Sequence, residues 1–120
     1  MNVALWIAAG LLAVVALAGG AMKVVTPKAK LAAQRGGEWT AGFSAEMIKG
    51  IGVLELLAAC GLVLPRLLDV APVLVAVTAV CWMALMVGAA ITHRRLGQDK
   101  LVLVTVAYFG IAAFVAVGRL

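Results

Sequence analysis

Glu55 is the residue of this sequence best placed to carry chemistry. It lies near the middle of a mostly apolar run, Ile48 to Leu64. A carboxylate at that depth in an apolar segment is costly unless it is protonated, paired or turned toward a polar cavity. The sequence therefore indicates a site for a ligand, a proton or a partner at Glu55. A protonated carboxyl group that only joins two helices is the alternative.

Other polar side chains are expected to lie at a similar depth. Tyr108 is as far into the last apolar segment as Glu55 is into its own, so its phenol can donate to the carboxyl group, and Thr105 lies one turn away. Lys23 and His93 end two further segments, and a lysine stem or an imidazole can extend toward the same place. We therefore expect Lys23, Glu55, His93 and Tyr108 to form one inward-facing polar cluster.

Each of these three additional residues also has a plainer interpretation. Lys23 can serve only as a stop signal for the first segment, and His93, which precedes two arginines, can be a hydrated residue at the membrane interface. Tyr108 can be a core residue with a satisfied hydroxyl group. We assign no catalytic residue on this basis.

The cysteines and the single histidine predict neither a disulfide nor a metal centre. Cys60 lies about four residues from the outer end of its segment and Cys81 about ten residues into the next, a depth difference of roughly 9 Å. A disulfide needs Cα atoms within about 7 Å of each other. One histidine and one buried glutamate are fewer ligands than metal sites normally have.

The elements that must position these residues are membrane-spanning helices. Apolar residues make up 66% of the 120 residues and charged residues only 12%, which excludes an ordinary soluble domain. About 20 residues of helix cross the hydrocarbon core, and the chain has four segments of about that length. We predict an all-α protein, one antiparallel four-helix transmembrane bundle over residues 1–120, with spans at about 3–22, 47–64, 70–92 and 101–118.

The basic residues predict how the chain is oriented. Eight of the ten Lys and Arg residues lie in or beside the first and third connections, and only Arg66 and Arg119 lie on the other side. By the positive-inside rule, both basic connections face the cytoplasm, whereas both termini and the short Pro65 to Asp69 turn face outward. We expect a multi-pass protein of the bacterial inner membrane, and no nucleic-acid partner, because the basic residues do not form one stripe. A cleaved signal peptide is the alternative for the first segment, but that segment lacks a basic n-region.

The connections carry signals of their own. Thr26 and Pro27 start, and Gly36 ends, a short basic helix that suits the headgroup region, with a mobile loop as the alternative. Ser44 is the expected N-cap of the helix that carries Glu55. Pro65 is expected to end that helix. Small residues at two sets of positions predict close helix contacts, within the chain or with a second copy of it. The two sets are Gly52 with Ala59, and Ala84 with Gly88 and Thr92.

The segment Ile51–Pro65 resembles the signature of DoxX-like membrane proteins, which has a Gly, a Glu three residues on, a Gly-Leu pair and a closing Pro. Gly19–Lys23 is similar to the glycine-then-lysine end of the first helix in that family. Gly88–His93 is similar to the small-residue run before a histidine at the end of the third. The resemblance implies the four-span fold over almost the whole chain.

The resemblance implies less about activity. The family takes its name from a small membrane subunit associated with thiosulfate:quinone oxidoreduction. Other relatives join a mycobacterial membrane complex for oxidative-stress defence, and distant animal relatives act as receptor-assembly chaperones or cargo receptors. The layout is also similar to that of vitamin K epoxide reductases, but this chain lacks their cysteine motif.

Three functions are compatible with these observations. The first is a non-catalytic component or assembly partner of a membrane redox complex, with a polar pocket around Glu55, a bound quinone as a possible cofactor and another membrane protein, or a second copy, as partner. The second is a quinone- or flavin-linked oxidoreductase in which Glu55 and His93 move protons. The third is a small proton-coupled transporter that depends on one membrane glutamate.

Overall fold

The computed structural model describes residues 2–33 and 37–119 and confirms the predicted all-α membrane fold. Four helices are long and apolar enough to cross a bilayer: α1 (Asn2–Val25), α3 (Ala45–Leu67), α4 (Val73–Arg95) and α5 (Asp99–Arg119). The first connection holds the short helix α2 (Lys28–Ala33) and a 3-10 helix, η1 (Gly37–Gly42). The part of the chain that the structure describes contains no strand.

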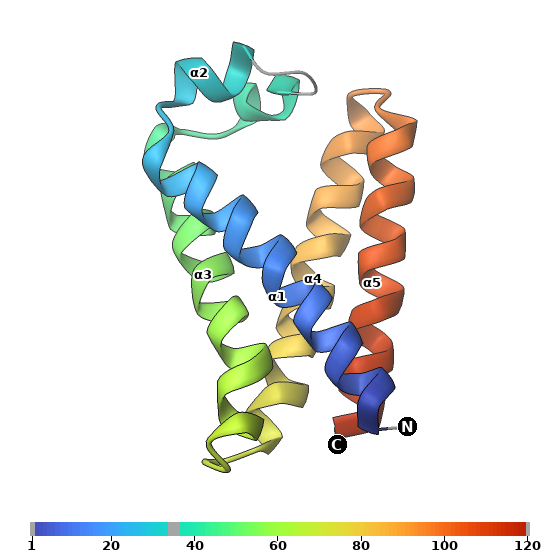
Figure 1. Cartoon of the computed structure of the whole chain (residues 1–120). Coiled ribbons are helices and arrows are strands. Elements are labelled where there is room, and N and C mark those ends of the chain that lie inside the picture. Colours follow the sequence, from blue (N-terminus) through green and yellow to red (C-terminus); the bar gives the residue numbers. More distant parts are fainter. Residues whose placement is uncertain (1, 34–36, 120) are drawn as a thin grey trace.

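The four long helices form an antiparallel bundle made of two close pairs. α1 packs mainly against α3 and α4 against α5, while contacts between α3 and α4 and between α1 and α5 join the pairs. In Figure 1, α1 runs diagonally across the bundle, with its first turns beside α5 and its last turns beside α3. The two pairs therefore diverge toward the end that carries α2 and η1, and the α3–α4 turn lies at the opposite end.

The outer faces of the helices are apolar, as a lipid environment requires. Within a bilayer, every backbone polar group must be paired inside the protein, which favours long uninterrupted helices whose outer side chains contact acyl chains. The large hydrophobic side chains that are exposed on the four spans include Val3, Ile7, Val14, Leu57, Leu103 and Val117.

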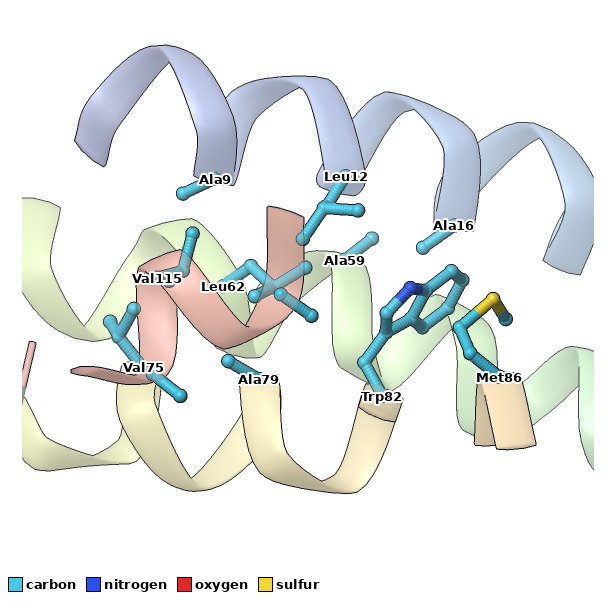
Figure 2. Packing of buried hydrophobic residues seen from close by; sticks show 12 residues of the cluster. Ala9, Leu12, Ala16, Ala59, Leu62, Val75, Ala79, Trp82, Met86 and Val115 are labelled. Atoms are coloured by element: carbon cyan, nitrogen blue, oxygen red, sulfur yellow. The ribbon is translucent and has the colours of Figure 1, made fainter. Parts of the chain in front are cut away.

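A hydrophobic core holds the two pairs together. Figure 2 shows side chains from all four spans converging there: Ala9, Leu12 and Ala16 from α1, Ala59 and Leu62 from α3, Val75, Ala79, Trp82 and Met86 from α4, and Val115 from α5. Leu12, Ala16, Ala79 and Val115 are fully buried. Because the alanines on α1, α3 and α4 are small, the backbones can approach closely around Leu12 and Leu62.

Glycines set the closest approach between α1 and α3. A Cβ atom on Gly52 would lie 2.8 Å from the Gly20 carbonyl oxygen and 2.8 Å from Lys23 Cβ. A Cβ atom on Gly20 would lie 2.7 Å from the Gly52 carbonyl oxygen. The predicted close contact at Gly52 is therefore confirmed, because no other residue fits at this crossing.

The second predicted small-residue contact is not made among the residues that the structure describes. A Cβ atom on Gly88 would meet nothing within 4 Å, and both Gly88 and Ala84 are exposed. These residues lie on the side of α4 from which the α1–α3 pair has diverged, so the space in front of them is open rather than packed.

α3 begins as predicted but does not end at Pro65. The Ser44 hydroxyl group accepts a hydrogen bond from the Met47 N–H at 3.1 Å, as expected of an N-cap. Pro65, however, lies inside the helix, which continues to Leu67. A proline lacks only one backbone donor, and spanning helices tolerate it because irregular backbone in lipid would leave more groups unpaired. The turn to α4 accordingly follows at Leu68 to Pro72, with positive φ at Asp69 and Ala71.

The first connection contains the predicted short helix and one element that was not predicted. α2 starts at Lys28 rather than at Pro27, whose carbonyl group accepts from Lys30 and Leu31, and its predicted end at Gly36 lies outside the described residues. η1 then packs on α2, with Gly37 against the Leu31 carbonyl group. Together α2 and η1 form a small folded unit over one end of the bundle (Figure 1).

A Schellman motif ends α4 and fixes the turn to α5. Gly97, at φ +71°, donates its N–H to the Arg94 carbonyl group, and the N–H of Gln98 reaches back to the carbonyl group of His93. The Gln98 carbonyl group then accepts from Leu101 and Val102 at the start of α5. Gln98 therefore lies directly beside His93 at the end of the bundle that carries η1.

Candidate functional site

Lys23 and Glu55 form an ion pair between α1 and α3. The Lys23 Nζ atom lies 2.7 Å from Glu55 Oε1, and the side chains are 21% and 7% exposed respectively. The Gly20–Gly52 crossing lies one turn away and brings the two helices close enough for this contact. A buried carboxylate needs such a partner, because its desolvation is otherwise not offset.

Neighbouring residues shape the surroundings of the pair. A Cβ atom on Gly19 would lie 2.9 Å from Glu55 Oε2, so a glycine at this position leaves the second carboxylate oxygen its space. The Lys23 Nζ atom also lies 5.6 Å from the centre of the Trp39 ring, within the range of a cation–π interaction. Trp39 in turn contacts Phe43 edge to face, with ring centres 6.0 Å apart. Trp39 of the first connection therefore lies over the ammonium group, and Phe43 packs against the Trp39 ring.

The ion pair lies on the wall of a cavity of about 520 Å³ between the diverging helix pairs. Ligand cavities in proteins typically measure roughly 300–1,000 Å³. Most of the lining is apolar, and Trp82 and Met86 belong both to the core and to the cavity wall. The lining residues come from α1 (Val15, Gly19, Lys23), the first connection (Trp39, Phe43), α3 (Ile51, Glu55), α4 (Trp82, Ala84, Leu85, Met86, Gly88, Ala89, Thr92, His93) and α5 (Leu101, Val104, Thr105, Tyr108).

A chain of hydrogen bonds connects the two basic connections at one end of the cavity. His93 Nδ1 and Gln98 Oε1 are 2.7 Å apart, and Gln98 Nε2 donates to Glu38 Oε2, also at 2.7 Å. His93 lines the cavity, whereas Glu38 is exposed on η1. These hydrogen bonds therefore join η1 to the turn between α4 and α5.

The sequence pattern of the DoxX-like family matches residues 7–115 of this chain. The chain belongs to the DoxX-like family. The match covers α3 and α4 and most of α1 and α5, and it includes the crossing glycines and every residue that lines the cavity. A comparison with curated proteins and one with solved structures give no match.

The structure of this DoxX-like protein brings the four predicted site residues to one cavity, although not in the predicted arrangement. Lys23, Glu55, His93 and Tyr108 all line it, and Thr105 does too. The carboxylate of Glu55, however, pairs with Lys23, and among the described residues it has no hydrogen bond from Tyr108. The reason is the tight α1–α3 crossing, whereas Tyr108 is carried by α5 in the other helix pair.

Sequence reasoning missed the residues that the connections contribute. Trp39 was given no role in the site, but it is half-buried over Lys23. Glu38 and Gln98 were given no role, and their contact joins positions 60 residues apart. Gly97 after a basic helix end was the one available signal, since a Schellman turn places the next residue beside the last turn of the helix.

The cysteines lie apart from this site. Cys60 on α3 and Cys81 on α4 are free thiols, both exposed on the helix surface, and neither lines the cavity. Within residues 2–33 and 37–119, no group of three or more His, Cys, Asp or Glu residues is arranged to hold a metal ion.

Proposed function

We propose that this DoxX-like protein is a non-catalytic component or assembly partner of a membrane redox complex, and that its cavity binds a quinone-class ligand from the bilayer. The observation that carries the proposal is the Lys23–Glu55 pair on the wall of a mostly apolar cavity between membrane-spanning helices. An apolar wall suits a ring and tail, and a few polar groups orient the head.

The position of the cavity supports a ligand that arrives through the membrane. The lining residues Ala84, Gly88 and Val104 are exposed although they lie within spanning helices. In a bilayer, such residues are in reach of acyl chains and of molecules dissolved among them. In the proposed orientation, with the first and third connections in the cytoplasm of a bacterium, the ligand head lies in the cytoplasmic half of the inner membrane.

Tryptophan fluorescence tests the ligand. Trp39 and Trp82 line the cavity, whereas Trp6 lies at the other end of the bundle beside Arg119. We expect a short-chain ubiquinone to quench the Trp6→Phe protein in nanodiscs saturably. In the matched control, Trp39→Phe/Trp82→Phe, the remaining Trp6 should show only linear, collisional quenching. Linear quenching in both proteins would refute ligand binding in the cavity.

Affinity purification tests the role in a complex. Isolation of the tagged chain from its native membrane in mild detergent should recover a stoichiometric membrane or redox protein. The purified chain alone should neither carry a flavin nor turn over a quinol. Quinol oxidation by the isolated chain would contradict the non-catalytic role and establish the oxidoreductase alternative instead.

A further inference from the structure

The hydrogen bonds of His93 determine which of its ring nitrogens carries a proton. A glutamate carboxylate only accepts, so the contact between Gln98 and Glu38 requires the amide nitrogen of Gln98 to face Glu38. The amide oxygen then faces His93, and an oxygen can only accept. His93 Nδ1 is therefore the donor, and in the neutral ring Nε2 keeps its lone pair.

Two threonines leave acceptors in the same cavity. The hydroxyl group of Thr92 donates to the Gly88 carbonyl group at 2.9 Å, and that of Thr105 donates to the Val102 carbonyl group at 2.7 Å. Each hydroxyl proton is thus used within its own helix, so the lone pairs of the hydroxyl oxygens remain available to accept hydrogen bonds from a ligand. Glu55 adds its second carboxylate oxygen, because Lys23 pairs with Oε1.

From this arrangement we infer that the cavity binds a ligand whose head carries hydroxyl donors, as an aromatic diol such as a hydroquinone does. Glu38 and Gln98 are positioning residues, because they keep the proton of His93 on Nδ1 and leave Nε2 as an acceptor for the ligand. The inference rests on the proposed function for the existence of a ligand and adds its chemical class. A quinone of the same size, which has only acceptors in its head, would leave the acceptors of His93, Thr92 and Thr105 unpaired. It could use only the donors of the cavity, such as the Trp82 Nε1–H, which has no hydrogen-bond partner among the described residues.

The tautomer of His93 can be measured directly, because the sequence contains one histidine. In the ¹⁵N NMR spectrum of labelled histidine, the neutral ring should show Nδ1 protonated and Nε2 free. Gln98→Ala should shift the ring to a mixture of tautomers. Gln98→Glu combined with Glu38→Gln should restore the Nδ1–H form, because the carboxylate at position 98 accepts from Nδ1 while the amide at position 38 donates to that carboxylate. An Nε2–H ring in the unaltered protein, or no change in Gln98→Ala, would overturn the positioning role.

Binding of a donor-bearing ligand and its blocked form tests the ligand class. An alkyl hydroquinone and its dimethyl ether have the same rings and tails, but the ether has no donors. Removing hydrogen bonds to a buried site typically weakens binding by roughly tenfold or more. We expect the protein in nanodiscs to prefer the hydroquinone by about that factor, and Gln98→Ala to lose most of the preference.

The outcomes separate this inference from the proposed function. Equal binding of both compounds would overturn the donor-bearing class while leaving a ligand cavity. Binding of neither compound, and no saturable quenching by the quinone, would remove the proposed ligand itself. Glu38→Gln gives a second variant at an exposed position, where a failure to fold is not expected. It should also mix the tautomers, since a glutamine at position 38 no longer fixes the Gln98 amide.

Discussion

At the scale of single residues, the Lys23–Glu55 pair is asymmetric. The Glu55 side chain is nearly inaccessible, whereas the Lys23 side chain is 21% exposed and its ammonium group also lies over Trp39. Loss of the lysine would leave a buried charge without a partner, while loss of the glutamate charge would leave a cation that still has water and an aromatic face. The two sides of one contact should therefore differ in their effect on stability.

Replacement of Lys23 should accordingly destabilise the protein more than replacement of Glu55. We expect Lys23→Met to lower the free energy of unfolding by about 2–4 kcal/mol, and Glu55→Gln by about 1–2 kcal/mol. The double variant should lose less than the sum, with a coupling of about 1–3 kcal/mol. Reversible unfolding in mixed micelles measures these values.

The matched control is Lys49→Met on α3, where the lysine is exposed. This change should stay within about 0.5 kcal/mol of the unaltered protein. The ion pair would be contradicted if Lys23→Met and Glu55→Gln lowered the free energy of unfolding equally and if these two losses simply added in the double variant.

At the scale of elements, the α1–α3 crossing determines where the pair can form. Gly20 and Gly52 allow the backbones to approach, and Lys23 and Glu55 each lie one turn beyond the crossing. A side chain at the crossing would have to push the helices apart, because the atoms it would meet include backbone oxygens that cannot rotate away.

Two glycines on α3 test this crossing. Gly52→Ala should destabilise the protein by roughly 1–3 kcal/mol through overpacking. Gly50→Ala should instead stabilise it by about 0.5–1 kcal/mol, because a Cβ atom there meets nothing within 4 Å and alanine favours the helix. Thermal unfolding of both variants in one detergent gives the comparison, and similar behaviour of the two would show that α1 and α3 do not cross at Gly52.

The elements were largely predictable from the sequence because lipid leaves few alternatives. Mostly apolar runs of sufficient length predicted all four spans, and Ser44 marked the start of α3. Pro65 misled the prediction, since a proline ends helices in water more often than it does among other spanning helices. The η1 element gave no signal because a short 3-10 segment has no periodicity to detect.

The candidate site was predictable only in part, because its contacts join residues that lie far apart in the sequence. Depth along the helices brought Lys23, Glu55, His93 and Tyr108 to one region, and the structure places all four on one cavity. Depth does not say which helices are neighbours, so the carboxylate was assigned to Tyr108 instead of to Lys23. The contact between Glu38 and Gln98 depends on two connections meeting, which no local pattern in the sequence indicates.

At the scale of the whole molecule, the two helix pairs are joined at one end and diverge at the other (Figure 1). The core fills the joined end, and the cavity occupies the divergent one. A small membrane protein that packed all four helices along their full length would have a larger core and no such space. We therefore interpret the divergence as the feature that gives this bundle its cavity.

The sharpest test of ligand binding in the cavity is photolabelling with an azido-quinone, followed by mapping of the modified peptides. Gly88 and Gly110 both have open space where a Cβ atom would lie, but only Gly88 lines the cavity. Ligand binding in the cavity predicts adducts on the cavity faces of α4 and α5, a strong reduction of labelling in Gly88→Leu, and unchanged labelling in Gly110→Leu. Adducts spread over the outer helix faces, with equal labelling of the two variants, would contradict it.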